Sequence, residues 1–238
     1  MLDILEVKNV TKKIDDKVIL DNISFSLPKG KIMGFVGPNG AGKTSTLKVI
    51  SGLSNYDSGE ITFYNKKIDE AKKGEIIFVQ DDPLIYEELT GYEYLHFIID
   101  LFDLKIEKKE LNKLIIDLMF EDSVDKEIRT YSLGMKKKIA LLGVLIINPR
   151  LLLLDEYLSG IDPINLYVIK NTLRNFTESG NSIFISTHQL ELAEKFCDII
   201  ISIEDGKILD KYIDMESILK ENGSLEDYFV SSFKGVSK

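Results

Sequence analysis

The sequence has 238 residues, of which 29% are charged and 44% are hydrophobic, and its formal net charge is −9. This acidic balance disfavours a general nucleic-acid surface, because phosphate backbones repel an acidic face. One cysteine, Cys197, and only two histidines exclude an internal disulfide framework and a histidine-rich metal site. The sequence shows no basic leader and no long apolar stretch, so it predicts a cytosolic protein without a spanning segment.

The first third of the chain predicts two strands, then a buried strand and a helix. Residues 2–10 and 18–27 have strand-like patterns, and a turn follows at Pro28-Lys29-Gly30. The apolar run 32–36 is typical of a short buried strand, and a helical pattern extends from Lys43 to about Leu53. A strand, a glycine-rich loop and a helix therefore follow one another in the order that a phosphate-binding loop requires.

The loop between that strand and that helix fits the pattern G-x-x-x-x-G-K-[ST]. The predicted nucleotide-binding residues here are Gly37, Pro38, Asn39, Gly40, Ala41, Gly42, Lys43, Thr44 and Ser45. The glycines let backbone N–H groups point inward at phosphate oxygens, and the start of the helix adds partial positive charge. Lys43 is expected to reach the β- and γ-phosphates, and the Thr44 hydroxyl to ligate Mg²⁺.

The rest of the chain alternates between strand and helix patterns. Strands are predicted at 59–63, 76–79, 151–154, 182–186, 198–203 and 207–209, and helical patterns at 90–121, 139–147 and 164–176. The lysines at 136–138 are interpreted as a solvated helix face or a contact patch. We predict a single α/β domain over residues 1–238, with a phosphate-loop NTPase core and a mostly parallel sheet. It would also have an N-terminal antiparallel β subdomain and a helical subdomain at about 82–130.

Two carboxylates follow the leucine run at 151–154. Four successive leucines suit a strand that is covered on both faces, and Asp155 emerges at its carboxyl end, where parallel sheets place ligands. Asp155 is predicted to hold Mg²⁺ through the metal's water shell, and Glu156 to polarise an attacking water as general base. The alternative is an acidic cap on a buried strand, and the phosphate loop upstream favours the metal site.

From Leu5 to Phe229, the chain resembles the ATP-binding subunits of ABC transporters. The family signature, usually L-S-G-G-Q, corresponds to Tyr131-Ser132-Leu133-Gly134-Met135, and its Y-S-x-G-M-K form is similar to that of bacitracin-resistance and lantibiotic-immunity exporters. The family's D-loop corresponds to residues 159–162, which end in Asp162. Its switch histidine corresponds to His188 in the run Ser186-Thr187-His188.

This resemblance implies a head-to-tail dimer in which each ATP lies between one copy's phosphate loop and the other copy's signature. Ser132 and Gly134 would then contact the γ-phosphate across the interface, with Leu133 and Met135 completing the signature. An N-cap role for Ser132 is compatible with this. His188 would sense the γ-phosphate. The implied cofactors are ATP and Mg²⁺. The implied partner is a polytopic membrane permease, at the cytoplasmic face of the cell membrane, and no nucleic acid is expected.

Two positions depart from the family pattern. The aromatic residue that stacks on adenine corresponds here to Ile14, which gives apolar cover without π-stacking. The glutamine that senses the metal and links to the membrane partner corresponds to Asp81 in an alignment without gaps, and Gln80 lies one place earlier. Either Gln80 or Asp81 takes that role. Because Ile14 cannot stack on the base, selectivity for adenine is expected to be loose.

The function that follows is an ATP-binding and ATP-hydrolysing subunit that energises a separate permease, an exporter of a drug, peptide or antibiotic. The alternative is a soluble ABC-type ATPase in translation or DNA repair, without a membrane partner. One nucleotide domain, no long coiled-coil insertion and no basic face disfavour that alternative. A regulator that hydrolyses nothing is disfavoured by Glu156, Asp162 and His188. A GTPase is disfavoured because the N-K-x-D motif is absent.

Overall fold

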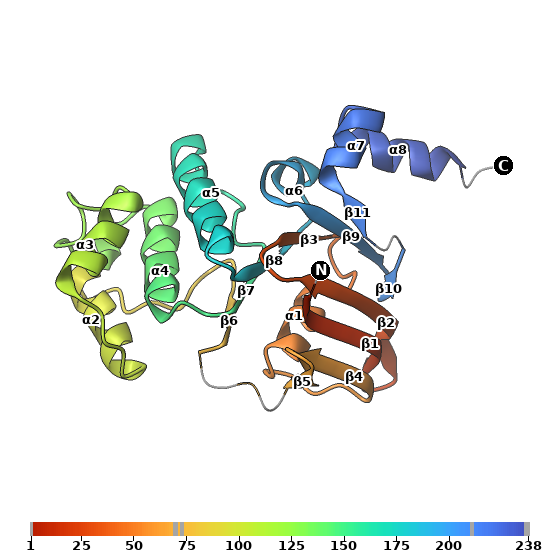
Figure 1. The fold of residues 1–238 in the computed structure, drawn as a ribbon, viewed down its shortest axis with the longest axis horizontal. Helices are drawn as coiled ribbons and strands as arrows, with labels where there is room; N and C mark the ends of the chain where they lie inside the picture. Colours follow the sequence, from red (N-terminus) through yellow and green to blue (C-terminus); the bar gives the residue numbers. More distant parts are fainter. Residues whose placement is uncertain (1, 69–70, 72–73, 210–211, 236–238) are drawn as a thin grey trace.

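The computed structural model describes residues 2–68, 71, 74–209 and 212–235, which form two β-sheets with surrounding helices (Figure 1). The first sheet is antiparallel, with the order β2-β1-β4-β5. Its strands are β1 (Asp3–Ile14), β2 (Lys17–Pro28), β4 (Ser58–Phe63) and β5 (Lys66–Lys67). The expected N-terminal antiparallel subdomain is confirmed, and β1 is longer than predicted because it pairs with β2 as far as Ile14.

The second sheet has the order β10-β9-β3-β8-β7-β6, and β11 pairs with β9. Its strands are β3 (Ile32–Val36), β6 (Ile76–Val79), β7 (Leu151–Asp155), β8 (Ser182–Thr187), β9 (Ile199–Glu204), β10 (Lys207–Ile208) and β11 (Ile213–Asp214). Strands β6, β7, β8, β3 and β9 pair in parallel, so their carboxyl ends lie along one edge. The mostly parallel sheet is therefore confirmed.

The helices are arranged in groups around the parallel sheet (Figure 1). They are α1 (Lys43–Ile50), α2 (Gly91–Leu101), α3 (Lys108–Asp117), α4 (Leu133–Ile147), α5 (Pro163–Glu178), α6 (Leu190–Phe196), α7 (Met215–Asn222) and α8 (Leu225–Gly235), with the 3-10 turn η2 (Ile128–Thr130). Helices α2, α3 and α4 form one end of the molecule, far from the antiparallel sheet, so the helical group extends beyond residue 130.

Strand β7 separates two hydrophobic cores. Leu152 and Leu154 pack into the core beneath the helices, whereas Leu151 and Leu153 pack into the core shared with the antiparallel sheet. All four leucines are fully buried, as expected for a strand covered on both faces. Because the strand is held from both sides, the two carboxylates that follow it have a fixed position at the edge of the sheet.

Helix boundaries differ from the sequence-based prediction in two regions. The pattern at 90–121 forms two helices, because α2 ends at Leu101 and Asp103 adopts a positive φ of 50° before α3 begins. Helices α6, α7 and α8 were not predicted, and α7 and α8 are attached to the core by the buried Met215, Ile218 and Leu225. None of the helices in the described part of the chain is long and apolar enough to span a membrane.

Two of the three lysines at 136–138 are buried, so the cluster is not a solvated helix face, which was one of its two interpretations. Lys137 is 1% exposed and Lys138 is 5% exposed. Lys138 donates hydrogen bonds to the carbonyls of Leu118 and Met119, just after α3, and its ammonium lies over the Phe120 ring. Burial lowers the pKa of Lys138, because desolvation penalises its charged form. These carbonyls come from a distant segment, so local sequence spacing could not reveal them.

Candidate functional site

The phosphate loop connects the carboxyl end of β3 to the start of α1. A Cβ atom at Gly37 would lie 2.2 Å from the Ile203 carbonyl oxygen, and Gly42 has a φ of +109°, so both positions require glycine. Lys43 is 5% exposed, and its ammonium donates to the carbonyl oxygens of Gly37 at 2.7 Å and Pro38 at 3.1 Å. The loop therefore curls around the lysine, while residues 38–40 remain exposed.

Asp155 lies beside the phosphate loop because β7 is separated from β3 by β8 alone. Its Oδ2 accepts a hydrogen bond of 2.8 Å from the Thr44 hydroxyl, and its Oδ1 accepts one from the Ser186 hydroxyl. Asp155 is 7% exposed. The structure thus brings together Thr44 and Asp155, two of the residues that the sequence assigns to the metal, whereas Asp81, a candidate for the third, is bonded to Lys137.

Glu156 turns its carboxylate toward two cationic or titratable groups. Its Oε2 lies 3.0 Å from His188 Nδ1, and its Oε1 lies 3.3 Å from Lys43 Nζ. Glu156 has a φ of 51°, and its backbone N–H donates to Ser186 at the end of the neighbouring strand. Among the described residues, none donates a hydrogen bond to the buried Oε1. This oxygen therefore keeps an unfilled acceptor position beside the Lys43 ammonium, whereas each Asp155 oxygen accepts from a hydroxyl.

The signature and the D-loop contact each other. The Ser132 hydroxyl caps α4 by accepting from the Met135 N–H at 3.3 Å. Asp162 caps α5 by accepting from the Asn165 N–H at 3.1 Å, and this bond lowers the pKa of the Asp162 carboxyl. Gly134 packs against this cap, since a Cβ there would lie 3.1 Å from the Asn165 side-chain nitrogen.

The signature is not bonded to the phosphate loop of its own chain in the described ranges, and part of it is exposed. Within the described ranges, no hydrogen bond or ion pair joins residues 131–135 to residues 37–45. Leu133 is 49% exposed, and on the first turn of α5 Ile164 and Tyr167 are 72% and 67% exposed. The signature and the adjacent helix end therefore present uncovered apolar side chains together.

The two positions that depart from the family pattern differ in their surroundings. Ile14 is 51% exposed at the end of β1, beside the turn to β2. Gln80 is exposed directly after β6, whereas Asp81 accepts a hydrogen bond of 2.7 Å from Lys137. Lys137 was not among the predicted site residues. Its spacing gives a signal, because it lies three residues after Gly134 and four before Leu141, both of which are buried on the same helix.

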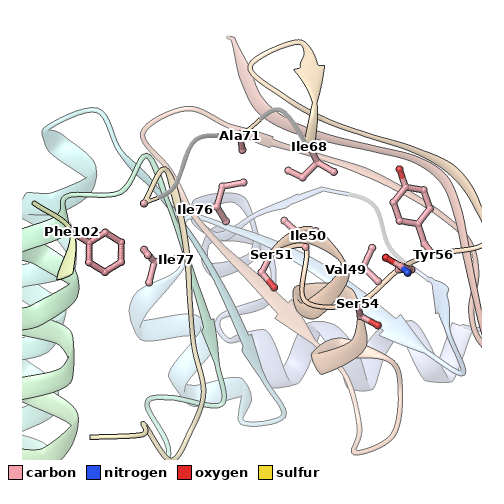
Figure 2. Close-up of a pocket in the computed structure, with 13 residues that line it drawn as sticks. Val49, Ile50, Ser51, Ser54, Tyr56, Ile68, Ala71, Ile76, Ile77 and Phe102 are labelled. Carbon is pink, nitrogen blue, oxygen red and sulfur yellow. The ribbon is translucent and has the colours of Figure 1, made fainter. Parts of the chain in front are cut away.

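A groove of about 650 Å³ lies at the opposite end of α1 from the phosphate loop. Val49, Ile50 and Tyr56 line it from the α1 side, and Ile76, Ile77 and Phe102 line it from the side of β6 and α2 (Figure 2). An eight-residue helix is about 12 Å long, so this groove is separated from the phosphate loop by the length of α1. Sequence patterns did not indicate this groove.

Residues 20–159 match the family model described as "ABC transporter". The chain is 31% identical to the lantibiotic transport ATP-binding protein SrtF of Streptococcus pyogenes, over 91% of this chain and 94% of that protein. It is 31% identical to the bacitracin transport ATP-binding protein BcrA of Enterococcus faecalis, over 99% and 77% of the two chains. A solved ATP-binding subunit of an ABC transporter superposes with a TM-score of 0.82 at 25% identity, covering 96% of this chain and 98% of that one.

Proposed function

Because this chain belongs to the ABC transporter family, we propose that its whole length is one ATP-binding domain that hydrolyses ATP at the Glu156 site and powers an export permease. The observation that carries the proposal is the convergence of Lys43 and His188 on the two oxygens of the Glu156 carboxylate. An ammonium, a carboxylate and an imidazole at the end of parallel strands suit the transfer of a phosphoryl group to water.

The phosphate loop supports binding of the nucleotide's phosphates. Among the described residues, the Lys43 ammonium has polar contacts with two loop carbonyls and with the partly buried Glu156, so it can exchange the carboxylate for a phosphate oxygen. The Thr44 hydroxyl and the Asp155 carboxylate are hard oxygen donors that fit Mg²⁺, and they would hold it between them. Bound there, Mg²⁺ would neutralise phosphate charge. Ile14 would cover the base with an aliphatic surface.

Glu156 would act as the general base, and His188 would orient it. The buried Oε1 accepts no hydrogen bond from the described residues, so it keeps an unfilled acceptor position that a proton from the attacking water would use. The His188 ring holds the other oxygen at 3.0 Å and would sense the terminal phosphate. Asp155 would serve the metal instead, because its carboxylate is paired with the Thr44 hydroxyl.

Two copies of the chain would share each ATP. The Ser132 hydroxyl and the start of α4 are exposed, and they carry a helix N-terminus that favours a phosphate. They are not bonded to the phosphate loop of their own chain within the described part. Their ligand would be the ATP that is held by the phosphate loop of a second copy. The exposed Leu133, Ile164 and Tyr167 supply apolar surface for that contact.

The permease would dock in the groove at the far end of α1. The groove joins the nucleotide core, through Ile50 and Ile76, to the helical group, through Phe102 (Figure 2). A partner seated there would respond to movement of either part. The chain would then work at the cytoplasmic face of the membrane, without nucleic acid. Export of a peptide or antibiotic is supported by the similarity to SrtF and BcrA, which are transport proteins for a lantibiotic and for bacitracin.

A hydrolysis assay tests the core of this proposal. The purified chain with Mg²⁺ should release phosphate from ATP, and Lys43→Ala should abolish release by weakening nucleotide binding. A tagged chain in its own host should sediment with membranes, and Phe102→Asp should release it while leaving hydrolysis by the purified chain unchanged. Absence of hydrolysis in the unaltered protein at any concentration would overturn the proposal.

A further inference from the structure

The ammonium of Lys137 joins three segments that are distant in the sequence. It donates hydrogen bonds of 2.7 Å to the Asp81 carboxylate and 2.7 Å to the Ser159 carbonyl. It also lies 5.7 Å from the centre of the Tyr157 ring. Asp81 follows β6, Ser159 opens the D-loop, and Lys137 itself stands on α4. One cation therefore connects the end of one strand, the loop after another strand and the signature helix.

Burial makes these contacts obligatory for the lysine. Lys137 is 1% exposed, and a buried ammonium is strongly disfavoured unless charges and acceptors surround it. The Tyr157 hydroxyl donates to the backbone carbonyl of Lys137, and this tyrosine is fully buried. The helix turn that carries the lysine is thus attached to the residue after Glu156. A shift of Asp81 removes the only carboxylate bonded to Lys137 among the described residues.

Each joined segment carries a residue of the proposed machinery. Helix α4 begins directly after Ser132, one turn before the lysine. Tyr157 follows Glu156, and the D-loop ends at Asp162. Ser159 also accepts a hydrogen bond of 3.3 Å on its hydroxyl from the Gln189 side chain, next to His188. Ser159 therefore lies between the lysine and the residue that follows the proposed phosphate sensor.

We propose that Lys137 is a positioning residue that couples Asp81 to the D-loop. When Asp81 moves, the lysine loses its counter-charge, and its bond to the Ser159 carbonyl adjusts with it. The state of the segment at 81–87 is thereby transmitted to the loop that faces the second copy. This inference rests on the proposed function, since it assigns a role within paired ATP hydrolysis.

The neighbouring lysine provides a matched control. Lys136 forms an ion pair with Glu87, at the other end of the same segment, but its side chain is 24% exposed and that of Glu87 is 49% exposed. This pair does not include the D-loop. Asp81 is itself 59% exposed in its side chain, so both acidic residues can be neutralised without opening a cavity. Asp81→Asn and Glu87→Gln therefore remove equivalent charges from the two ends of one segment.

Hydrogen exchange on the nucleotide-free protein tests the coupling directly. Asp81→Asn should speed amide exchange in the peptide covering 157–162 by about 10-fold, because the buried lysine loses its counter-charge and the loop opens more often. Glu87→Gln should leave that peptide unchanged. Equal exchange in the Asp81→Asn and unaltered proteins would overturn the inference, as would an equal acceleration by both variants.

A double-mutant cycle on kcat tests whether the same coupling affects ATP hydrolysis. Asp81→Asn and Lys137→Met should each lower kcat by about 10-fold with little change in ATP affinity, and the double variant should fall by about 10-fold rather than about 100-fold. Lys137→Gln, which retains a donor for Ser159, should be less impaired than Lys137→Met. A 100-fold loss in the double variant would overturn the coupling. A protein that shows the exchange effect but never hydrolyses ATP would overturn the proposed function alone.

Discussion

His188 Nδ1 lies 3.0 Å from Glu156 Oε2, so an imidazole and a carboxylate meet at the ends of the neighbouring strands β8 and β7. Lys43 reaches the other oxygen of the same carboxylate from the phosphate loop. Three segments of the chain therefore converge on one side chain. This convergence makes Glu156 the position where a minimal substitution is most informative.

Glu156→Gln should slow ATP hydrolysis by roughly 10²–10⁴-fold, because the amide cannot take a proton from water. ATP binding should persist, since the Lys43 contacts with Gly37 and Pro38 are unchanged. Phosphate release and nucleotide binding measure the two effects. Size-exclusion chromatography of this variant should show a dimer with ATP and a monomer without it. Unchanged turnover would rule out Glu156 as the base.

Thr44→Val should raise the Mg²⁺ concentration for half-maximal hydrolysis by roughly 10- to 100-fold. The substitution deletes the hydroxyl that donates to Asp155 and is proposed to bind the metal. Thr44→Ser keeps the hydroxyl and should remain near the unaltered value. Thr46→Val is the matched control. The Thr46 hydroxyl lies on the same helix but bonds to the Gly42 carbonyl, so its removal should leave the Mg²⁺ dependence unchanged. A metal response that is equal in all three variants would contradict this assignment.

Ser132→Ala removes a helix cap, which should cost about 1 kcal/mol of stability, and Thr90→Ala should cost a similar amount at the start of α2. Only the Ser132 variant should also reduce hydrolysis, because only this cap is proposed to meet the second copy's ATP. Ser132→Arg should abolish the ATP-dependent dimer and leave binding by the monomer near normal. Thermal unfolding, phosphate release and chromatography separate these effects, and equal activity losses at the two caps would count against the shared site.

Ile14→Tyr should tighten ATP binding by roughly fivefold, since stacking of a base on an aromatic ring contributes about 1–3 kcal/mol. The side chain at position 14 is 51% exposed, so the ring fits without displacing the core. Ile14→Leu keeps an aliphatic surface and serves as the control. Titration with ATP and GTP gives both affinities. No gain for the tyrosine variant would show that the base binds elsewhere.

The cap at Asp162 should respond to acid. The Asn165 N–H holds the pKa of Asp162 below its ordinary value of 3.8. A lowered folded-state pKa gives stability that is present above the ordinary pKa and is lost as the pH falls through the folded value. Asp162→Asn keeps an acceptor oxygen but does not titrate. Its thermal midpoint should therefore fall less steeply than that of the unaltered protein below about pH 4, and parallel curves would contradict this.

Much of the fold could be predicted because the signals are local. Burial could be predicted from the leucines of β7 and from the apolar run of β3. The turn between β3 and α1 could be predicted from its glycines. The boundaries of α2 and α3 could not be predicted, because an apolar pattern continues across Phe102 while the backbone turns at Asp103. The role of Lys137 could not be predicted either, because its acceptors Asp81 and Ser159 lie 56 and 22 residues away in the sequence.

The four leucines of β7 have a consequence for how the sheet is aligned. Because leucine is suited to either core, sliding the strand by one residue would exchange the two sets of side chains without exposing anything polar. Hydrophobic packing of the four leucines therefore discriminates poorly between the two registers. What distinguishes the correct alignment is the carboxylate at the strand's tip, which meets the Thr44 and Ser186 hydroxyls in one position only. The carboxylate of Asp155 thus favours a single register of β7 in the sheet, in addition to its proposed role at the metal.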